Sequence, residues 1–536
     1  MLKTTEHTNA LYYGDNLTVL KNQIETESVD LIYLDPPFNS NASYNVLFKA
    51  PDGHKSHAQM EAFEDTWGWI THEAEKAFDG VMCSGNSDAA EMLRAMRAFL
   101  HENDMMAYLA MMAVRLIELR RVLKPTGSLY LHCDPTASHY LKILLDAIFG
   151  KENFKNEIVW KRSHPKGHAF TRFATSHDVI FYYAKDSRKT GWNQTYTPHD
   201  PATVLQQYSL QDSEGRRFQL TSLLNPNPDR PNLTYEFLGV KKVWRWTKDR
   251  MQSEFEKGRI IVPRGGEGVP RYKRYLDEQE GVPIGDFWDD IEIAAGGERL
   301  GYPTQKPIAL LERILRASSN EGDVVLDPFC GCGTTVHAAQ KLNRRWIGID
   351  ITHLAISLIQ KRLRDAFGPI PIEVHGTPKD LDGARALAAQ DKYQFQWWAV
   401  SLVDAVPYGG KKKGADTGID GIIYFKPDGK TTEKAIVSVK GGENVGVAMV
   451  KDLIATVARE KAEMGVFITL AEPTGPMKKE AIAAGFYKTE YGEYPRIQIL
   501  TVEQLFAGRR PDMPWRDSTI FKKARREMKG TQKRLL

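Results

Sequence analysis

The chain has 536 residues, of which 42% are hydrophobic, 26% charged and 10% aromatic, and its formal net charge is +4. This composition excludes a collagen-like, coiled-coil or mostly disordered chain and predicts two or three globular domains. No run reaches the ~18 apolar residues of a membrane span, and the N-terminus lacks the apolar core of a secretory signal. Four cysteines are too few for a disulfide framework, so we expect a protein of a reducing cytosol. Because the net charge is near zero, any attraction to nucleic acid must come from local basic patches.

The first third of the chain alternates predicted strands and helices. Residues 29–34 form a nearly continuous apolar run, which predicts a buried strand ending at Asp35. The elements expected after it are a helix, a second buried strand and a helix, over 105–123, 128–132 and 139–149. Such alternation predicts a parallel α/β sheet.

The middle of the chain differs from the parts on either side. Residues 191–299, with a start as early as residue 160, are rich in aromatic and basic residues and in Pro/Gly turns, which predicts an inserted module of short strands and loops. Alternation then resumes, with elements expected over 307–318, 324–327, 334–342, 345–350 and 351–367. The predicted domains are therefore 1–190 with 300–367, the insert 191–299, a third region 379–510 and a basic tail 511–536.

A glycine-rich loop follows the predicted strand 324–327. Its residues are Asp327, Pro328, Phe329, Cys330, Gly331, Cys332, Gly333 and Thr334. Glycine permits a positive φ and a close approach of backbone to a ligand. Asp350 ends the next strand, 23 residues after Asp327, where an acid can hold ribose hydroxyls. The loop lacks the full glycine pattern of dinucleotide and phosphate loops, which favours a nucleoside cofactor without phosphates, although a purely structural turn is the alternative.

A second polar turn, Asp35-Pro36-Pro37-Phe38, ends the strand 29–34. Prolines lock the turn and remove backbone donors, so the Pro36 carbonyl stays free to accept a hydrogen bond. A carboxylate, an accepting carbonyl and an aromatic face together suit a nucleobase that carries an exocyclic amino group. Hydrogen bonds from the amino N–H groups to Asp35 and to the Pro36 carbonyl would localise the lone pair on the amino nitrogen. Phe38 would stack on the ring of the base. A structural strand-end turn is again the alternative.

Together, these motifs resemble the β class of DNA amino-methyltransferases, in which the catalytic motif precedes the cofactor loop, and more widely the Mod-type subunits of type III restriction systems. The resemblance covers about residues 11–363. The segments that carry it are Tyr13-Gly14-Asp15-Asn16, Asp35 to Ser40, Leu123 to His132, Ile148 to Phe154, Ile158 to Trp160, Ser176 to Tyr183 and Tyr302 to Pro307. It implies a Rossmann-like S-adenosylmethionine-dependent methyltransferase fold with an inserted target-recognition module.

The resemblance also implies roles for particular residues. Asp15 and Asn16 contact the cofactor adenine, Thr304 and Lys306 close the methionine site, and residues 176–183 line the target-base pocket. The remaining cofactor residues are those of the glycine loop, with Asp350. The implied reaction is in-line methyl transfer to an amino nitrogen of a flipped base in duplex DNA, with Asp35 orienting the amino group and no metal required.

The resemblance favours adenine N6 as the target, because an acid heads the catalytic motif, and cytosine N4 remains the alternative. Cytosine C5 chemistry needs a Pro-Cys nucleophile, and the sequence contains none.

A prokaryotic cytosol or nucleoid is the expected location, and a homodimer or a restriction partner subunit fits the resemblance. Two other functions, a DNA-binding structural protein and a nicotinamide dehydrogenase, are less favoured because neither gives the intact motif at Asp35 a role. We expect the insert to bind DNA through Arg and Lys, with strong salt dependence.

The third region resembles the PD-(D/E)xK type of metal-dependent nuclease. Asp420, a hairpin and Lys440 on the next strand match that pattern, and Asp420 is the candidate Mg²⁺ ligand. Ser438 stands where the pattern has an acid, and a neutral hydroxyl is a weak Mg²⁺ ligand. Two readings therefore stay open. In one, the chain is a bifunctional restriction–modification enzyme that cleaves DNA with Mg²⁺. In the other, this is an α/β module in which residues 411–413 and Lys440 only hold phosphate.

Overall fold

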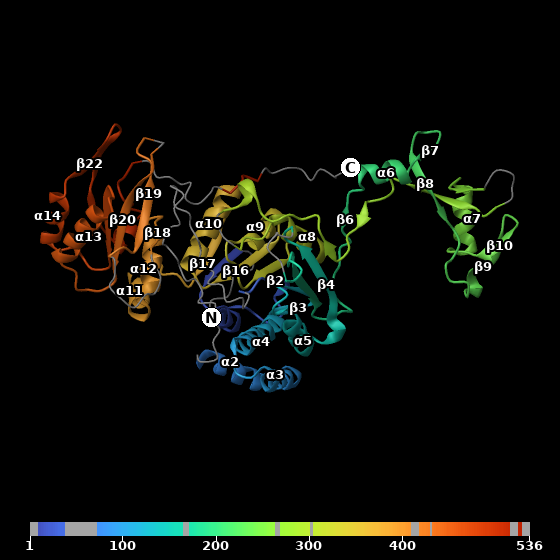
Figure 1. Ribbon diagram of the computed structural model, residues 1–536, viewed down its shortest axis with the longest axis horizontal. Coiled ribbons are helices and arrows are strands. Elements are labelled where there is room, and N and C mark those ends of the chain that lie inside the picture. The colour runs from blue at the N-terminus through green and yellow to red at the C-terminus, as the bar shows by residue number, and fades with distance from the viewer. Residues whose placement is uncertain are drawn as a thin grey trace. The chain divides into compact units, whose positions relative to one another are not determined.

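The computed structural model describes residues 9–37, 72–164, 171–262, 268–300, 304–408, 418–428, 431–514 and 524–527. Within these ranges, residues 194–285 form one compact unit and the rest forms the other (Figure 1). None of the described helices is long and apolar enough to cross a membrane.

The larger unit is built on a mixed sheet with the strand order β14-β4-β5-β3-β2-β15-β16-β1-β17. Its strands are β1 (Asn9–Tyr13), β2 (Val29–Leu34), β3 (Leu123–Cys133), β4 (Phe154–Lys161), β5 (His177–Ala184), β14 (Phe287–Trp288), β15 (Val324–Asp327), β16 (Arg345–Asp350) and β17 (Ile372–His375). β5 runs antiparallel to its neighbours β3 and β4, whereas β2, β15, β16 and β1 are parallel. Parallel pairing of β2 with β15 brings the ends of two strands that are far apart in sequence to the same sheet edge.

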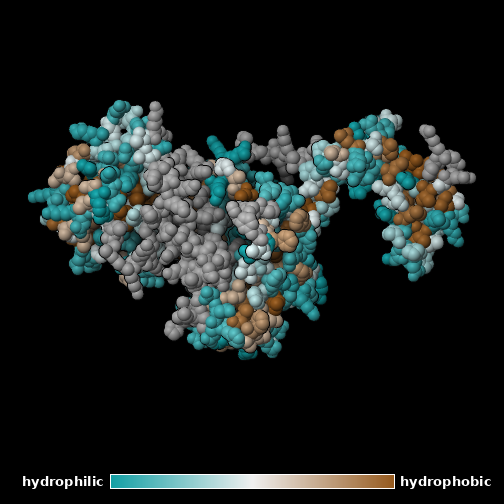
Figure 2. Space-filling view, in the orientation of Figure 1, coloured by the Kyte–Doolittle hydropathy of each residue, from teal (hydrophilic) through white to brown (hydrophobic). Residues whose placement is uncertain are grey.

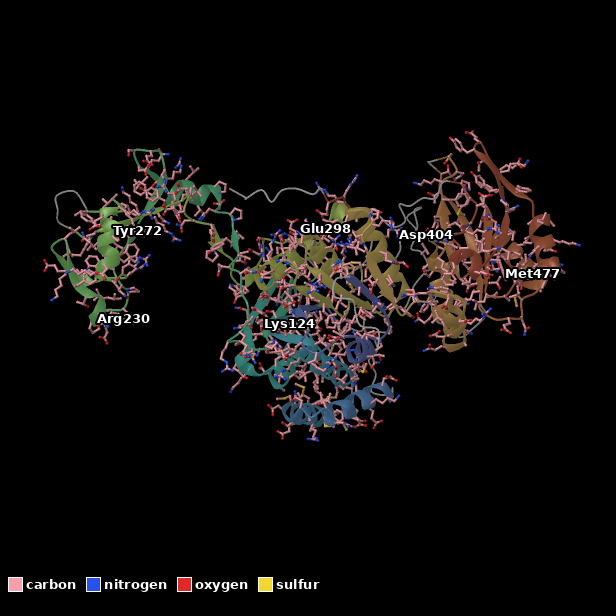
Figure 3. All side chains as sticks on the ribbon, turned by 180° about the vertical axis from the view of Figure 1, so that it is seen from behind. Lys124, Arg230, Tyr272, Glu298, Asp404 and Met477 are labelled. Carbon is pink, nitrogen blue, oxygen red and sulfur yellow. The ribbon has the colours of Figure 1, made fainter. Side chains whose placement is uncertain are left out.

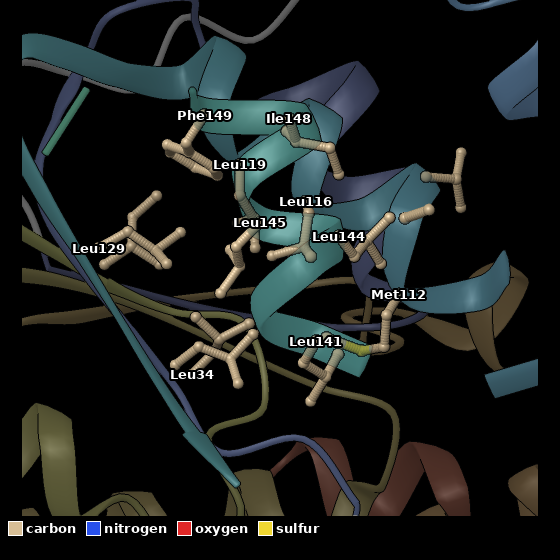
Figure 4. Packing of buried hydrophobic residues seen from close by; sticks show 14 of the residues in the cluster. Leu34, Met112, Leu116, Leu119, Leu129, Leu141, Leu144, Leu145, Ile148 and Phe149 are labelled. Carbon is tan, nitrogen blue, oxygen red and sulfur yellow. The ribbon is translucent and has the colours of Figure 1, made fainter. Parts of the chain in front are cut away.

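Helices cover both faces of this sheet. They are α1 (Asn16–Gln23), α2 (His72–Met82), α3 (Ser87–Leu100), α4 (Asp104–Val122), α5 (Ser138–Phe149), α8 (Ile308–Ser318), α9 (Thr334–Lys341) and α10 (His353–Phe367). One face packs against α1, α4 and α5 in a large apolar core, where Leu34 and Leu129 of the sheet meet Leu116, Leu119 and Leu145 of α4 and α5 (Figure 4). α2 and α3 pack on α4 and α5 and extend the same core. α9 and α10 contact β15, β16 and β1.

The predicted elements of the methyltransferase-like part largely coincide with the observed ones. The strands expected over 29–34, 324–327 and 345–350 are β2, β15 and β16, and the long helix over 105–123 is α4. β3 differs, because it begins at Leu123 instead of residue 128. Leu123 pairs with Val29 and Ser128 with Leu31, so residues 124–127 bulge from the strand. Lys124, labelled in Figure 3, fastens this bulge by bonding both carboxylate oxygens of Asp30 at 2.8 Å.

The smaller unit, residues 194–285, lies inside the predicted insert. Its elements are β6 (Tyr196–Thr197), α6 (Pro201–Gln207), β7 (Leu210–Gln211), β8 (Arg217–Ser222), β9 (Thr234–Phe237), β10 (Val240–Val243), α7 (Lys248–Glu256), β11 (Ile260–Ile261), β12 (Arg271–Tyr275) and β13 (Val282–Pro283). A small core surrounds Trp244 and Met251. Large apolar side chains stay exposed on this unit, including Leu205 at 63% and Val282 at 46%, and Figure 2 shows hydrophobic patches on it. A unit of this size buries a smaller share of its surface than a larger domain does. The unit ends at residue 285, before the predicted limit of 299, because Phe287 and Trp288 pair with β4.

The C-terminal region has its own sheet, in the order β18-β19-β20-β21-β24. Its elements are α11 (Leu381–Gln390), α12 (Lys392–Ser401), β18 (Val406–Pro407), β19 (Gly421–Phe425), β20 (Glu433–Lys440), α13 (Val447–Arg459), β21 (Met464–Thr469), α14 (Gly475–Ala483), β22 (Phe486–Thr489), β23 (Gly492–Pro495), β24 (Ile497–Thr501) and α15 (Val502–Phe506). Two apolar clusters, one on each face, bury this sheet, as alternating side chains on β20 show: Val437 belongs to one cluster and Ile436 to the other.

Candidate active site

Four strand ends gather at one edge of the large sheet. β2 leads into Asp35, β15 and β16 end on Asp327 and Asp350, and β1 leads into the turn at Gly14. The register pairs Tyr13 with Asp350 and Leu326 with Ile32, which brings Asp35 and the glycine loop side by side although almost 300 residues separate them in sequence. Ligand sites of α/β proteins form at this edge of parallel strands.

The Asp35 carboxylate is paired with a lysine. Lys306 Nζ lies 2.5 Å from Asp35 Oδ2, and both side chains are largely buried. The resemblance implies a place for Lys306 at the methionine site, which stays a prediction, and in the structure Lys306 contacts the candidate catalytic acid in the cavity that the glycine loop also lines. Phe38, the fourth residue of the motif, lies outside the described residues.

The lysine is held by a small network that the sequence did not reveal. Gln305 accepts a hydrogen bond from the Leu300 amide at 2.8 Å and donates one to the Glu298 carbonyl at 2.7 Å. The Glu298 carboxylate, labelled in Figure 3, accepts from the Ile308 amide at the start of α8 at 2.6 Å. These bonds fix both ends of the segment that presents Lys306 to Asp35.

The glycine loop has the backbone that its glycines permit. Gly331 and Gly333 have φ values of 51° and 75°, in the left-handed region. A Cβ on Gly333 would lie 2.7 Å from Ile359 of α10, so no other residue fits without a shift. The Gly331 amide donates to Asp350 Oδ2 at 2.9 Å, which joins the loop to the acid of the next strand.

Two buried arginines support the cofactor residues from behind. Arg362 donates to the Cys332 carbonyl at 3.0 Å and to the Thr334 hydroxyl at 3.2 Å. Arg115 of α4 bonds Asp15 Oδ1 at 2.7 Å and Asn16 Oδ1 at 2.6 Å. Arg115 interrupts an apolar run in the sequence, and a lone charge on a buried helix face was the signal that could have found it.

The buried acids carry perturbed pKa values. Burial raises the pKa of Asp327 to about 7, even though the Thr335 hydroxyl and the Phe329 amide favour its charged form. Burial also raises the pKa of Asp350 to about 6, against hydrogen bonds from the amide and hydroxyl of Thr352 and from the Gly331 amide. Acids with strongly shifted pKa values that face one cavity are typical of a functional site.

A cavity of about 670 Å³ unites these groups. The predicted site residues that line it are Asp15, Asn16, Asp35, Pro36, Pro37, Thr304, Lys306, Asp327, Pro328, Phe329, Gly331, Thr334 and Asp350. Gly333 begins α9 immediately beside this lining. The structure therefore brings the expected cofactor residues and the expected catalytic acid to a single cavity.

The nuclease-like motif looks different. Asp420 Oδ2 accepts a hydrogen bond from the Val439 amide at 2.6 Å, so this acid ties the start of β19 to β20. Ser438 is buried on β20, and the buried Thr469 pairs with Lys440 on the neighbouring strand. In the ranges that the structure describes, no group of three His, Cys, Asp or Glu side chains could hold a metal, so the Mg²⁺ prediction finds no support. Residues 411–413 lie outside the described residues.

Comparison with known proteins agrees with the cavity. Residues 29–361 match the N6/N4 DNA methylase family, and residues 400–507 match a family described as NACHT-associated inactive Restriction Endonuclease 1. The Type II methyltransferase M.EcaI of Enterobacter cloacae is 30% identical over 68% of this chain and 71% of its own length. The StyLTI Mod subunit of Salmonella typhimurium is 24% identical over 62% of this chain, but only 50% of its own length is matched. DNA adenine methyltransferase YhdJ of Escherichia coli is 25% identical over 66% of this chain and 82% of its own. The chain thus belongs to the N6/N4 family of S-adenosylmethionine-dependent DNA methylases and carries a restriction-endonuclease-like domain at its C-terminal end.

Proposed function

We propose that this chain methylates adenine N6 at a specific site in duplex DNA, as part of a restriction–modification or defence system. The observation that carries the proposal is the shared cavity, in which Asp35 lies beside the glycine loop and the two buried acids. Adenine is favoured by the acid at the head of the catalytic motif, and the related YhdJ is named an adenine methyltransferase. Cytosine N4 is the second candidate, since the family includes both activities.

Asp35 and Pro36 would act on the amino group of the flipped base. Each N–H of that group donates to one acceptor, the Asp35 carboxylate or the Pro36 carbonyl, which localises the lone pair on nitrogen for attack. Lys306 fixes the carboxylate at 2.5 Å before the base arrives. Asp35 then receives the released amino proton, directly or through water.

The residues of the cavity fit S-adenosylmethionine. Bound there, the cofactor supplies an electrophilic methyl group on a sulfonium centre. Asp15 and Asn16 would hold its adenine, Asp350 its ribose, and the loop from Asp327 to Thr334 its methionine part. Glycine at position 333 lets the loop backbone adopt a left-handed conformation close against Ile359.

The insert would read the DNA sequence. Its surface combines basic and aromatic residues, with Arg250 lying 4.4 Å over the Trp246 ring and Lys241 and Lys242 exposed on β10. Tyr272, labelled in Figure 3, packs edge-on against Trp246. Lys and Arg contacts to phosphate make binding strongly salt-dependent. Binding to duplex that stays unchanged between low and moderate salt would contradict this assignment.

The C-terminal domain would bind DNA or a partner without cutting. Its matched family is described as inactive, and Ser438 occupies the position where an acid would be needed to hold Mg²⁺. A prokaryotic cytosol, a homodimer and a separate restriction subunit complete the proposal.

The test is direct. Purified protein is incubated with mixed-sequence duplex DNA and S-adenosylmethionine without added metal, and the DNA is digested to nucleosides for mass spectrometry. We expect N6-methyladenine from the wild type. Asp35→Ala should lower the rate by about 10²- to 10⁴-fold, the range of general acid–base groups, while cofactor binding by calorimetry is retained.

The matched control is Asp382→Asn, which changes a carboxyl on α11 that is 93% exposed and should leave the rate unchanged. N4-methylcytosine would keep the mechanism and replace adenine by cytosine. A full rate in Asp35→Ala would remove Asp35 from the mechanism, and failure to bind S-adenosylmethionine would overturn the cofactor assignment.

A further inference from the structure

A buried chain of polar side chains lies beneath the candidate catalytic acid. Tyr33 on β2, His132 on β3 and Asp178 on β5 are each at most 2% exposed, in a core that is otherwise apolar. The Tyr33 hydroxyl lies 2.9 Å from His132 Nδ1, and His132 Nε2 lies 3.1 Å from Asp178 Oδ2. Arg162 Nε forms an ion pair with the other carboxylate oxygen at 3.2 Å, and its side chain is 41% exposed.

The chain fixes the protonation of its histidine. Burial would raise the pKa of Asp178, but the hydrogen bond from His132 and the charges of Lys306 and Arg162 lower it, so this carboxylate only accepts. Burial and the nearby Lys306 lower the pKa of His132, which keeps the imidazole neutral. A neutral imidazole that donates from Nε2 to Asp178 must accept at Nδ1. The Tyr33 hydroxyl is therefore the donor to His132, and both protons between Tyr33 and Asp178 point toward the Asp178 carboxylate.

This chain connects the two parts of the site. Tyr33 stands two residues before Asp35, on the same face of the extended strand, and it lines the cavity. Asp178 belongs to the segment that the sequence places in the target-base pocket. Because Tyr33 sends its proton to His132, it does not donate to Asp35, and the Asp35 carboxylate, whose Oδ2 Lys306 already contacts, is left to accept from other donors.

We propose that Tyr33, His132 and Asp178 are positioning residues, which hold the Asp35 carboxylate and the base pocket in register through a hydrogen-bond chain of fixed direction. The inference rests on the proposed function, because it describes how the same site is held for transfer. A network that only stabilises the fold is the competing explanation. The two explanations predict different results for a His132 variant that is as stable as the wild type. A positioning role predicts slower methyl transfer, and a purely structural role predicts an unchanged rate.

The kinetic test compares three variants of the full chain. His132→Leu removes both hydrogen bonds, and we expect kcat to fall about 10- to 100-fold, the usual effect of losing a positioning partner, with the KM for S-adenosylmethionine unchanged. His132→Gln offers an amide oxygen to Tyr33 and an amide N–H to Asp178, so it should recover much of the rate. His139→Leu changes an exposed histidine on α5 and is the matched control.

Two measurements separate positioning from folding. Thermal melting and cofactor binding show whether each variant is folded, and Asp178→Asn, which lets the imidazole turn to the other tautomer, replaces His132→Leu if that variant is unfolded. A wild-type kcat in a folded His132→Leu or Asp178→Asn would overturn the proposal. So would equal losses in the Leu and Gln variants.

The tautomer provides a readout that does not need activity. Spectra of protein labelled with ¹⁵N-histidine should show His132 protonated at Nε2 and unprotonated at Nδ1, assigned by the signal that His132→Gln removes. A proton on Nδ1 would contradict the direction of the chain. If the wild type methylates no duplex, the proposed function fails. The His132 tautomer then tests separately whether the hydrogen bonds between Tyr33, His132 and Asp178 have the proposed direction.

Discussion

The methyltransferase sheet and the C-terminal sheet place polar residues at comparable strand ends but use them differently. In the first, Asp35, Asp327 and Asp350 surround a cavity, and burial raises the pKa of the last two. In the second, Asp420 bonds a backbone amide and its neighbouring strands present Ser438 and Thr469. Both sheets are well packed. The two regions therefore differ in the polar side chains at their strand ends and not in the fold that supports those side chains.

The comparison has an energetic side. Buried ionisable groups oppose folding unless they are paired or neutralised, so a site that keeps several of them bears a cost in stability. Buried hydroxyls such as Thr469 can be satisfied by neutral neighbours, here the Ala471 carbonyl and amide at 3.1 Å. The methyltransferase edge retains that cost, and its acids are the ones that we propose to hold the cofactor and the base.

The strongest test of this contrast is at the glycine loop. Gly333→Ala adds a Cβ 2.7 Å from Ile359 at a φ of 75°. An L-residue in the left-handed region costs about 1–2 kcal/mol, so we expect cofactor affinity to fall about tenfold or more as the loop shifts. Calorimetric titration with S-adenosylmethionine measures this change.

Its matched control is in the C-terminal domain. A Cβ on Gly442 meets nothing within 4 Å, so Gly442→Ala should leave cofactor affinity as in the wild type. Equal affinities for wild type and Gly333→Ala would mean that the loop does not shape the cofactor site.

A second test uses the raised pKa values of the acids. Asp327 and Asp350 have folded pKa values of about 7 and about 6, above the ordinary value of 3.8. Their contribution to the stability of the unliganded protein is therefore fully present below about pH 4 and is lost as the pH rises through 6 to 7. A cationic cofactor prefers the ionised acids, so its affinity should rise about tenfold between pH 5.5 and 8.

Thermal melting with and without S-adenosylmethionine at each pH follows both effects. Asp327→Asn removes the acid with the higher pKa and should flatten the rise in affinity above pH 6. An affinity that falls with increasing pH in the wild type would show that the acids do not face the cofactor's positive charge.

The smallest effect on methylation is expected from a substitution in the C-terminal domain. Asp420→Ala removes the acceptor of the Val439 amide and should lower the unfolding free energy by about 1–3 kcal/mol, the cost of an unpaired buried donor. Methylation should be unchanged, and neither protein should nick plasmid DNA with Mg²⁺. Metal-dependent cleavage by the wild type that disappears in Asp420→Ala would restore the nuclease reading.

The sequence predicted the strand ends of the site with good accuracy. Periodicity placed β2, β15 and β16, and the motifs on them pointed to Asp35, the glycine loop and Asp350, which line one cavity in the structure. Apolar runs ending in Asp, Pro or Gly are local signals, since a buried strand must stop where the chain turns or becomes polar. The bulge at residues 124–127 was missed because its cause is the pairing of Leu123 with Val29, almost a hundred residues away.

By itself, then, the sequence determined which residues can carry the chemistry: an acid before two prolines, a loop that needs glycine, and an acid one strand later. Only the tertiary structure decided which of them meet. Lys306 at Asp35, Arg115 behind Asp15 and His132 between Tyr33 and Asp178 are contacts between strands and helices distant in the chain. Local sequence patterns encode turns and periodicity. Contacts between distant residues depend instead on the order and register of the strands, and a short segment of sequence does not contain that information.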